Sequence, residues 1–253
     1  MDSPIESVGS APPARALWCG GLFLPLFIVA VSARALSVEP PPDIHHSALH
    51  EAADRCDPES GRGFVDALST DTRTAEINRL DREGHTPLAC AARNGCLALA
   101  RILLEQGAAV DATDDDTRWT PLLQAADQRH ADMVRYLLTR GASVNVRAGF
   151  GQTPLTAAIL GAVFTFGPEG DRDDTVHALL DGGADVDLPG ESGWTQLMAA
   201  VFQGDANLVQ LLIRKGADLA IRDSRGKSAL DYADEREEHD IRNILVNRRT
   251  MDR

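Results

Sequence analysis

The chain has 253 residues, a formal net charge of −13, and a hydrophobic fraction of 43%. Such an acidic balance argues against nucleic acid and anionic lipid as partners, because both require a cationic surface. It favours basic or apolar protein surfaces as partners.

The first 35 residues predict an export signal or a membrane anchor. Residues 16–33 form an uncharged, mostly apolar run with a basic residue before it, and small residues stand at Ala33 and Ala35. This order is typical of a secretory signal peptide that is cleaved after one of those alanines. The alternative is an uncleaved anchor, since 18 residues just suffice to cross a bilayer.

Either interpretation places the rest of the chain outside the cytoplasm. We expect a periplasmic or secreted protein, or one anchored in the membrane by its N-terminal segment. A short proline-rich linker at 36–46 would follow that segment. Lys215 and Lys227 are the only lysines, while Arg, Ala, Gly and Asp are abundant. This composition is typical of a GC-rich genome and indicates a bacterial source.

A seven-residue phrase then recurs six times and reads Thr-Pro-Leu-x-x-Ala-Ala in its clearest copies. Successive copies start 39, 34, 33, 42 and 33 residues apart. A phrase with a period near 33 residues indicates a stack of repeated units. The copies start at Ser47, Thr86, Thr120, Thr153, Thr195 and Ser228.

Each copy predicts a helix pair followed by a turn. The threonine suits a helix N-cap and the proline suits the first helical position. Gly95, Gly204 and, less clearly, Gly161 are expected to end the first helix in the left-handed conformation. Apolar residues follow at helical spacing, including Leu137, which we expect to be buried. Gly-Ala pairs and a turn rich in Asp and Asn complete the unit.

Together these features resemble the ankyrin repeat family, over residues 47–249. The resemblance implies an all-α solenoid of about six helix-turn-helix repeats, each with a projecting β-turn finger. Such repeats are stable only when stacked, because none buries its apolar face alone. The expected repeats are 47–80, 81–113, 114–147, 148–188, 189–222 and 223–249.

Three departures from the repeat pattern stand out. The third repeat carries one additional residue and lacks the turn glycine. The first repeat carries about six additional residues between Cys56 and Asp81. The fourth carries about nine additional residues between its helices, among them Phe164 and Phe166.

The chain offers few residues for chemistry. After removal of the signal, Cys56, Cys90 and Cys96 remain; three is an odd number, so no complete disulfide framework is expected. We interpret them as small packed residues, with a Cys90–Cys96 bridge as the alternative.

Metal and enzyme functions are not predicted. His45 and His46 lie in the linker, and His50 falls where ankyrin repeats commonly carry a structural histidine. Neither a phosphate-binding glycine loop nor a nucleophile elbow occurs in the sequence. We therefore expect a protein that is not an enzyme and has no cofactor and no metal.

A binding surface is predicted instead. In ankyrin relatives the residue before each threonine faces solvent on the finger and often contacts the partner. Two tryptophans in such a row indicate a binding hot spot, unless each folds over the neighbouring finger as packing. Arg118 and Phe150 lie beside the row, while Phe164 and Phe166 form a competing surface. The row consists of His85, Trp119, Gln152, Trp194 and Lys227.

The sequence thus predicts an exported or membrane-tethered interaction scaffold. It would be an adaptor, an inhibitor or a stabilising partner of another protein. Two alternatives remain open. One is a secreted effector that acts on a target in another cell, and the other is an enzyme with an unrecognised site.

Overall fold

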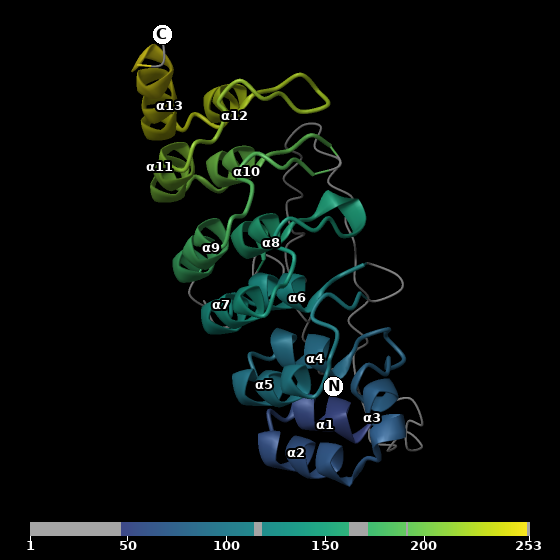
Figure 1. Ribbon diagram of the computed structural model, residues 1–253. Helices are drawn as coiled ribbons and strands as arrows, with labels where there is room; N and C mark the ends of the chain where they lie inside the picture. The colour runs from purple at the N-terminus through teal and green to yellow at the C-terminus, as the bar shows by residue number, and fades with distance from the viewer. Residues whose placement is uncertain (1–46, 114–117, 162–171, 191, 252–253) are drawn as a thin grey trace, which may run out of the picture. The chain divides into compact units, whose positions relative to one another are not determined.

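The computed structural model describes residues 47–113, 118–161, 172–190 and 192–251, and the fold is built from those ranges (Figure 1). The predicted signal or anchor, the linker, and the insertion residues Phe164 and Phe166 lie outside them. Within the described ranges, no helix combines the length and apolar character that a membrane span requires.

The described residues form six helix pairs and one additional helix. The helices are α1 (Ala48–Asp54), α2 (Pro58–Ala67), α3 (Thr70–Ile77), α4 (Pro87–Arg93), α5 (Leu97–Glu105), α6 (Pro121–Asp127), α7 (Ala131–Thr139), α8 (Pro154–Leu160), α9 (Arg172–Asp181), α10 (Gln196–Gln203), α11 (Ala206–Arg214), α12 (Ala229–Glu235) and α13 (His239–Met251), with a 3-10 turn, η1 (Gly149–Gly151).

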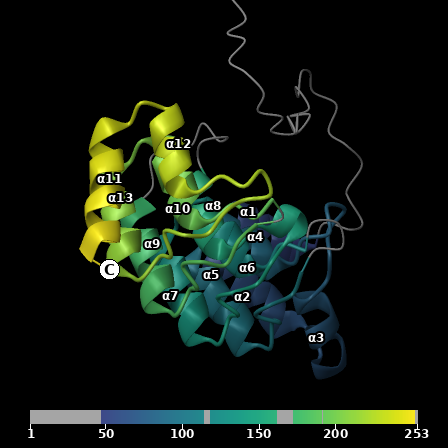
Figure 2. The same ribbon diagram turned by 90° about the horizontal axis from the view of Figure 1, so that it is seen from above.

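The pairs stack in chain order. The first helices α1, α4, α6, α8, α10 and α12 each contact the next in one row, and each contacts its own partner helix. The partner helices α5, α7, α9, α11 and α13 follow one another in a second row beside the first (Figures 1 and 2). This arrangement confirms the predicted all-α solenoid of about six helix-turn-helix repeats.

The repeated threonine begins the first helix, as predicted. The Thr86 hydroxyl accepts a hydrogen bond from the Ala89 backbone N–H at 3.2 Å, and Thr120, Thr153 and Thr195 act alike. Proline occupies the first helical turn in α4, α6 and α8. Each such cap contributes about 1 kcal/mol by pairing an N–H that the helix leaves free.

The core is a continuous band of leucine and alanine between the two helix rows. Leu137 in α7 is fully buried, as the helical spacing predicted. The leucines of three successive threonine phrases are Leu122, Leu155 and Leu197. Each side chain is at most 1% exposed to solvent. Burying each leucine contributes about 1.5–3 kcal/mol, and the small alanines let neighbouring helices approach closely.

The first helices end in two ways. Gly95 and Gly204 adopt the predicted left-handed conformation, with φ of 70° and 73°. Arg129 and Cys56 occupy the equivalent place with positive φ although neither is glycine. Gly161 is different: its φ is −47°, so the left-handed expectation was wrong there. It packs against backbone, and a Cβ at this site would lie 2.4 Å from the Asp127 carbonyl oxygen.

The cysteines pair differently from our expectation. Cys56 and Cys96 form a disulfide with a Cα–Cα distance of 5.1 Å, whereas Cys90 is free and buried. Neither the packed-residue interpretation nor the Cys90–Cys96 alternative is correct for this pair. The bridge forms because the turn after α1 lies beside the N-cap of α5 in the next repeat, a neighbour 40 residues away in sequence.

The first repeat accommodates its additional residues as helix. The segment between Cys56 and Asp81 forms α2 and α3, so the first repeat has three helices instead of two. Asn78, just after α3, joins this repeat to the next: its side-chain oxygen accepts a 2.7 Å hydrogen bond from the Ala109 N–H.

This contact begins a ladder of polar contacts along the stack. Asp111 accepts from the Ser143 N–H at 3.0 Å, Asn145 from the Asp185 N–H at 2.8 Å, and Asp187 from the Asp218 N–H at 3.0 Å. The turns rich in Asp and Asn therefore hold successive repeats in register through backbone donors.

Candidate functional site

Four fingers share one backbone geometry. In the second repeat, the Asp81 N–H donates to the His85 carbonyl at 2.9 Å, and the Gly84 N–H donates to the Asp81 carbonyl at 3.2 Å. The same two bonds close the fingers that end at Gln152, Trp194 and Lys227. The predicted row residues therefore occupy equivalent positions on equivalent turns.

The third finger has no glycine at the turn position where the other fingers have one. Arg118 stands where the other fingers have glycine, and its φ is 59°. A left-handed backbone at a residue with a Cβ is uncommon, and the other fingers avoid it with glycine. The rest of this turn, 114–117, lies outside the described residues, so of its predicted surface residues the structure places Arg118, which is exposed, and Trp119.

The two tryptophans are half-buried, which corrects the expectation of two exposed indoles. Trp119 and Trp194 both pack against the hydrophobic core. Trp194 lies edge-on to Phe202 and to Tyr232, with ring centroids 5.5 Å apart in each case. Part of each indole thus stabilises the stack, and only the remaining face is open to a partner.

An aromatic cluster therefore spans the last two repeats. We call Trp194, Phe202 and Tyr232 the C-terminal aromatic cluster. Trp194 lies on the fifth finger, while Phe202 and Tyr232 lie in α10 and α12. The three rings bring the finger row and the first-helix row together at one place.

Cations cover this cluster. The Arg236 guanidinium lies 4.6 Å from the Phe202 ring centroid. Arg225 and Lys227 each lie 5.6 Å from the Tyr232 ring centroid. Cation–π contacts of this kind contribute about 0.5–2 kcal/mol each, depending on how far the pair is withdrawn from water. Tyr232 is itself only 2% exposed, so the aromatic surface left open belongs to the half-buried Trp194 and Phe202, with Arg236 beside the Phe202 ring.

The buried carboxylate of Asp223 holds the cluster in place through hydrogen bonds. Tyr232 donates to Asp223 Oδ2, and Asp223 Oδ1 accepts from the Arg225 and Lys227 N–H groups, each at 2.9 Å. Burial opposes ionisation of Asp223, but these hydrogen bonds outweigh it and hold the pKa of its carboxyl below the ordinary value. The ionised carboxylate of Asp223 therefore holds the last finger in its folded conformation.

The remaining predicted residues are dispersed. His85 and Gln152 are half-buried on their fingers, and the Lys227 ammonium pairs with Glu235 at 2.5 Å. The backbone of Phe150 lies in η1, but the structure does not describe its side chain. The structure brings Trp194 and Lys227 together around Tyr232, and it does not join them to His85.

Phe202, Tyr232 and Arg236 were missed from the sequence. Phe202 and Tyr232 lie at helix positions that carry no aromatic residue in the other repeats, and Arg236 is the residue that follows α12. Their signal was the clustering of aromatic and basic residues in the last two repeats, which becomes visible only when the helices are stacked.

His50 has the structural role that the sequence indicated. Its Nε2 lies 3.0 Å from the His85 carbonyl oxygen, which can only accept, so Nε2 carries the proton. Nδ1 then accepts from the Ser47 hydroxyl at 2.8 Å. The histidine thus joins the first helix to the second finger.

The stacked helix pairs and the repeated fingers define a repeat solenoid whose half-buried finger row is suited to contact another macromolecule. Comparison with known proteins agrees with this class. A family profile described as Ankyrin repeats (3 copies) matches residues 49–148, 110–166 and 162–252. The chain belongs to the ankyrin repeat family. Members of this family generally mediate protein–protein interactions and are typically not enzymes.

Individual relatives point the same way. The human protein "Ankyrin repeat and SOCS box protein 16" is 34% identical over 189 residues, which is 74% of this chain and 40% of that protein. The mouse "B-cell lymphoma 3 protein homolog" is 29% identical over 154 residues, which is 61% of this chain and 32% of that protein. The chain thus spans less than half the length of these relatives.

A solved structure matches the fold. The crystal structure of EF0377, an ankyrin repeat protein, superposes with a TM-score of 0.67 at 28% sequence identity. The match covers 79% of this chain and 96% of that one.

Proposed function

We propose that this chain is an exported scaffold that binds a partner protein through its finger row and the adjoining C-terminal aromatic cluster. The observation that carries the proposal is the position of Trp194. Its indole is held between Phe202 and Tyr232 on a finger of fixed geometry, with cations beside the rings. A rigid, half-open aromatic surface orders little on binding, so it retains more of the contact energy.

Two features support export. The N-terminal segment has the composition of a signal or anchor. The Cys56–Cys96 disulfide is a second and independent feature, because such bonds persist in oxidising compartments and are rare in the cytosol. The scaffold would then serve as an adaptor, an inhibitor or a stabilising partner in the periplasm, at the membrane or outside the cell.

The binding face is tested by comparing variants of the tagged full chain after cross-linking in the producing cell. Trp119→Ala/Trp194→Ala removes the finger-row indoles. Tyr136→Ala is the matched control, since Tyr136 is a half-buried aromatic in α7 of the second helix row. We expect the double variant to lose the cross-linked partner and the control to retain it.

Two results would contradict the proposal. If the double variant stays folded and keeps the partner, the finger row is not the contact. If Phe164→Ala/Phe166→Ala loses the partner instead, the insertion is the binding surface. Thermal melting of each variant separates loss of contact from loss of folding, because Trp194 also packs against the core.

A further inference from the structure

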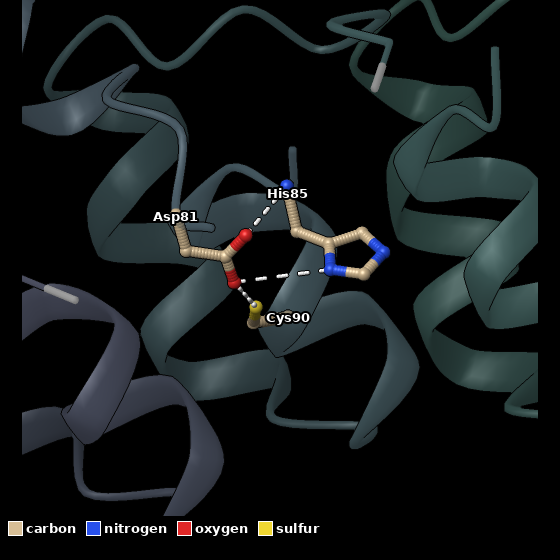
Figure 3. Close-up of side chains that lie close together, drawn as sticks. All are labelled: Asp81, His85 and Cys90. Carbon is tan, nitrogen blue, oxygen red and sulfur yellow. Dashed lines mark hydrogen bonds and ion pairs between the residues drawn. The ribbon is translucent and has the colours of Figure 1, made fainter. Parts of the chain in front are cut away.

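The second finger carries a second cluster, formed by the row residue His85 together with Asp81 and Cys90. Asp81, His85 and Cys90 point their ligand atoms toward one another (Figure 3). Asp81 Oδ2 lies 3.8 Å from His85 Nδ1 and 4.0 Å from Cys90 Sγ, and the three atoms all lie within 4.8 Å of one another. Carboxylate oxygen, imidazole nitrogen and thiolate sulfur are the three ligand types that zinc takes from proteins.

The surrounding finger fixes these groups in place. Asp81 Oδ1 accepts from the Glu83 and His85 N–H groups, each at 2.9 Å, so Oδ2 is turned toward the cluster. The His85 carbonyl is held by His50, and Cys90 lies in α4 with 1% exposure. The Asp81 carboxylate and the His85 backbone are therefore held in place by the finger itself.

One of the three ligand atoms lacks a hydrogen-bond partner among the described residues. His85 Nδ1 is buried and makes no hydrogen bond among the described residues. A buried polar atom without a partner is destabilising, so a group that pairs with it stabilises the site. Glu83 Oε2 lies 3.6 Å from the same nitrogen on the open side, where it or a water can supply a fourth ligand.

Other repeats carry different side chains at the positions equivalent to Asp81, His85 and Cys90. The last repeat has Asp223, Lys227 and Tyr232 in the same register, and there the Tyr232 hydroxyl closes the gap with a 2.5 Å hydrogen bond to Asp223. The fourth and fifth repeats carry alanine, Ala157 and Ala199, at the place of Cys90. Only the second repeat places three metal-ligating side chains at these positions.

Local charge also favours a cation. Asp81 Oδ2 is itself one of the ligand atoms, and the Glu83 carboxylate lies 3.6 Å from His85 Nδ1, so two carboxylates adjoin the site. We propose that Asp81, His85 and Cys90 bind a single Zn²⁺ ion, with Glu83 or water as the fourth ligand. The site would join the second finger to α4 and so fix the finger next to the disulfide-linked first repeat.

The geometry needs only a small adjustment. Tetrahedral zinc with bonds of about 2.0–2.3 Å places ligand atoms about 3.3–3.8 Å apart. The two separations from Asp81 Oδ2, 3.8 Å and 4.0 Å, are close to this range, and the third is at most 4.8 Å, so rotation of the His85 and Cys90 side chains brings the ligands to bonding distance. The Cys90 thiol gives up its proton on binding, and that proton passes to solvent.

The test uses the purified full chain with its disulfide kept oxidised. Zn²⁺ is titrated by calorimetry, and Co²⁺ serves as a spectroscopic probe because a thiolate ligand gives a near-ultraviolet charge-transfer band. We expect one metal per chain and a Co²⁺ band that Cys90→Ala abolishes. His85→Gln should weaken Zn²⁺ binding at least tenfold. Both replacements are residues that this chain uses at the same register, Ala157 and Gln152, so we expect both variants to fold.

Two controls locate the metal. His177→Gln changes an exposed histidine of α9 and should leave the affinity unchanged. His45→Gln/His46→Gln removes the linker histidines and should do the same. If the wild type takes up no Zn²⁺, if Cys90→Ala binds as tightly as the wild type, or if the linker variant abolishes binding, the proposal is wrong.

Discussion

The Tyr232 hydroxyl donates a 2.5 Å hydrogen bond to Oδ2 of Asp223, which joins the last finger to α12. Arg225 contacts both groups, so the three side chains form one network. A hydrogen bond to a buried charge is among the stronger kinds, since removing the donor leaves that charge less well compensated. This pair thus supports the C-terminal aromatic cluster.

Tyr232→Phe should lower the free energy of unfolding by about 1.5–3 kcal/mol, the usual cost of losing a hydrogen bond to a charged group. Urea denaturation followed by circular dichroism measures it. Tyr136→Phe in α7 is the control and should stay within about 0.5 kcal/mol of the wild type. Equal effects of the two substitutions would show that the Tyr232 hydroxyl does not support Asp223.

The same carboxylate makes stability depend on pH. The folded-state pKa of Asp223 lies below the ordinary value of 3.8, so its ionised form stabilises the fold fully above that value. The stabilisation is lost as the pH falls through the folded-state pKa. We expect the stability advantage of the wild type over Asp223→Asn to be constant near neutral pH and to narrow below about pH 4. A stability difference between the wild type and Asp223→Asn that grows as the pH falls would contradict the lowered pKa of Asp223.

Leu137→Ala should cost about 2–5 kcal/mol, because the side chain is fully buried in α7. Repeats couple to their neighbours only, so we expect the unfolding transition to broaden or divide in two. Denaturant unfolding with tyrosine and tryptophan probes reports both effects. Arg135→Ala, on the exposed side of the same helix, is the control. A loss under about 0.5 kcal/mol would refute the burial of Leu137.

Reduction of the Cys56–Cys96 disulfide should lower stability by about 4 kcal/mol, because the bond closes a loop of 40 residues in the unfolded chain. The measurement compares thermal unfolding with and without reductant. Cys56→Ser/Cys96→Ser should show the same loss and no response to reductant. If the oxidised protein presents three free thiols on titration under denaturing conditions after signal removal, the bond does not form.

The N-terminal proposal is tested by mass. Intact-mass analysis of protein recovered from the cell envelope should show loss of the residues up to Ala33 or Ala35. Ala33→Leu/Ala35→Leu, which enlarges both small residues, should block processing. Retention of residues 1–33 in the wild type would reject the cleaved signal and leave the anchor.

Local patterns sufficed for most of the fold. The Thr-Pro-Leu phrase predicted the helix starts because a cap and its acceptor lie three residues apart, and helical spacing predicted the burial of Leu137 because the period of a helix is fixed. The finger row was also predictable as a row, since the repeat brings His85, Trp194 and Lys227 to equivalent turns.

What the sequence alone determined is thus the repeated unit and its register, because these depend on contacts within a few residues. Tertiary structure decided everything that crosses between repeats. Cys56 pairs with Cys96 and Trp194 with Tyr232 because stacking makes neighbours of residues about 40 positions apart. Asp81, His85 and Cys90 converge because the turn brings the finger back over α4. Only the folded backbone shows that these three side chains meet.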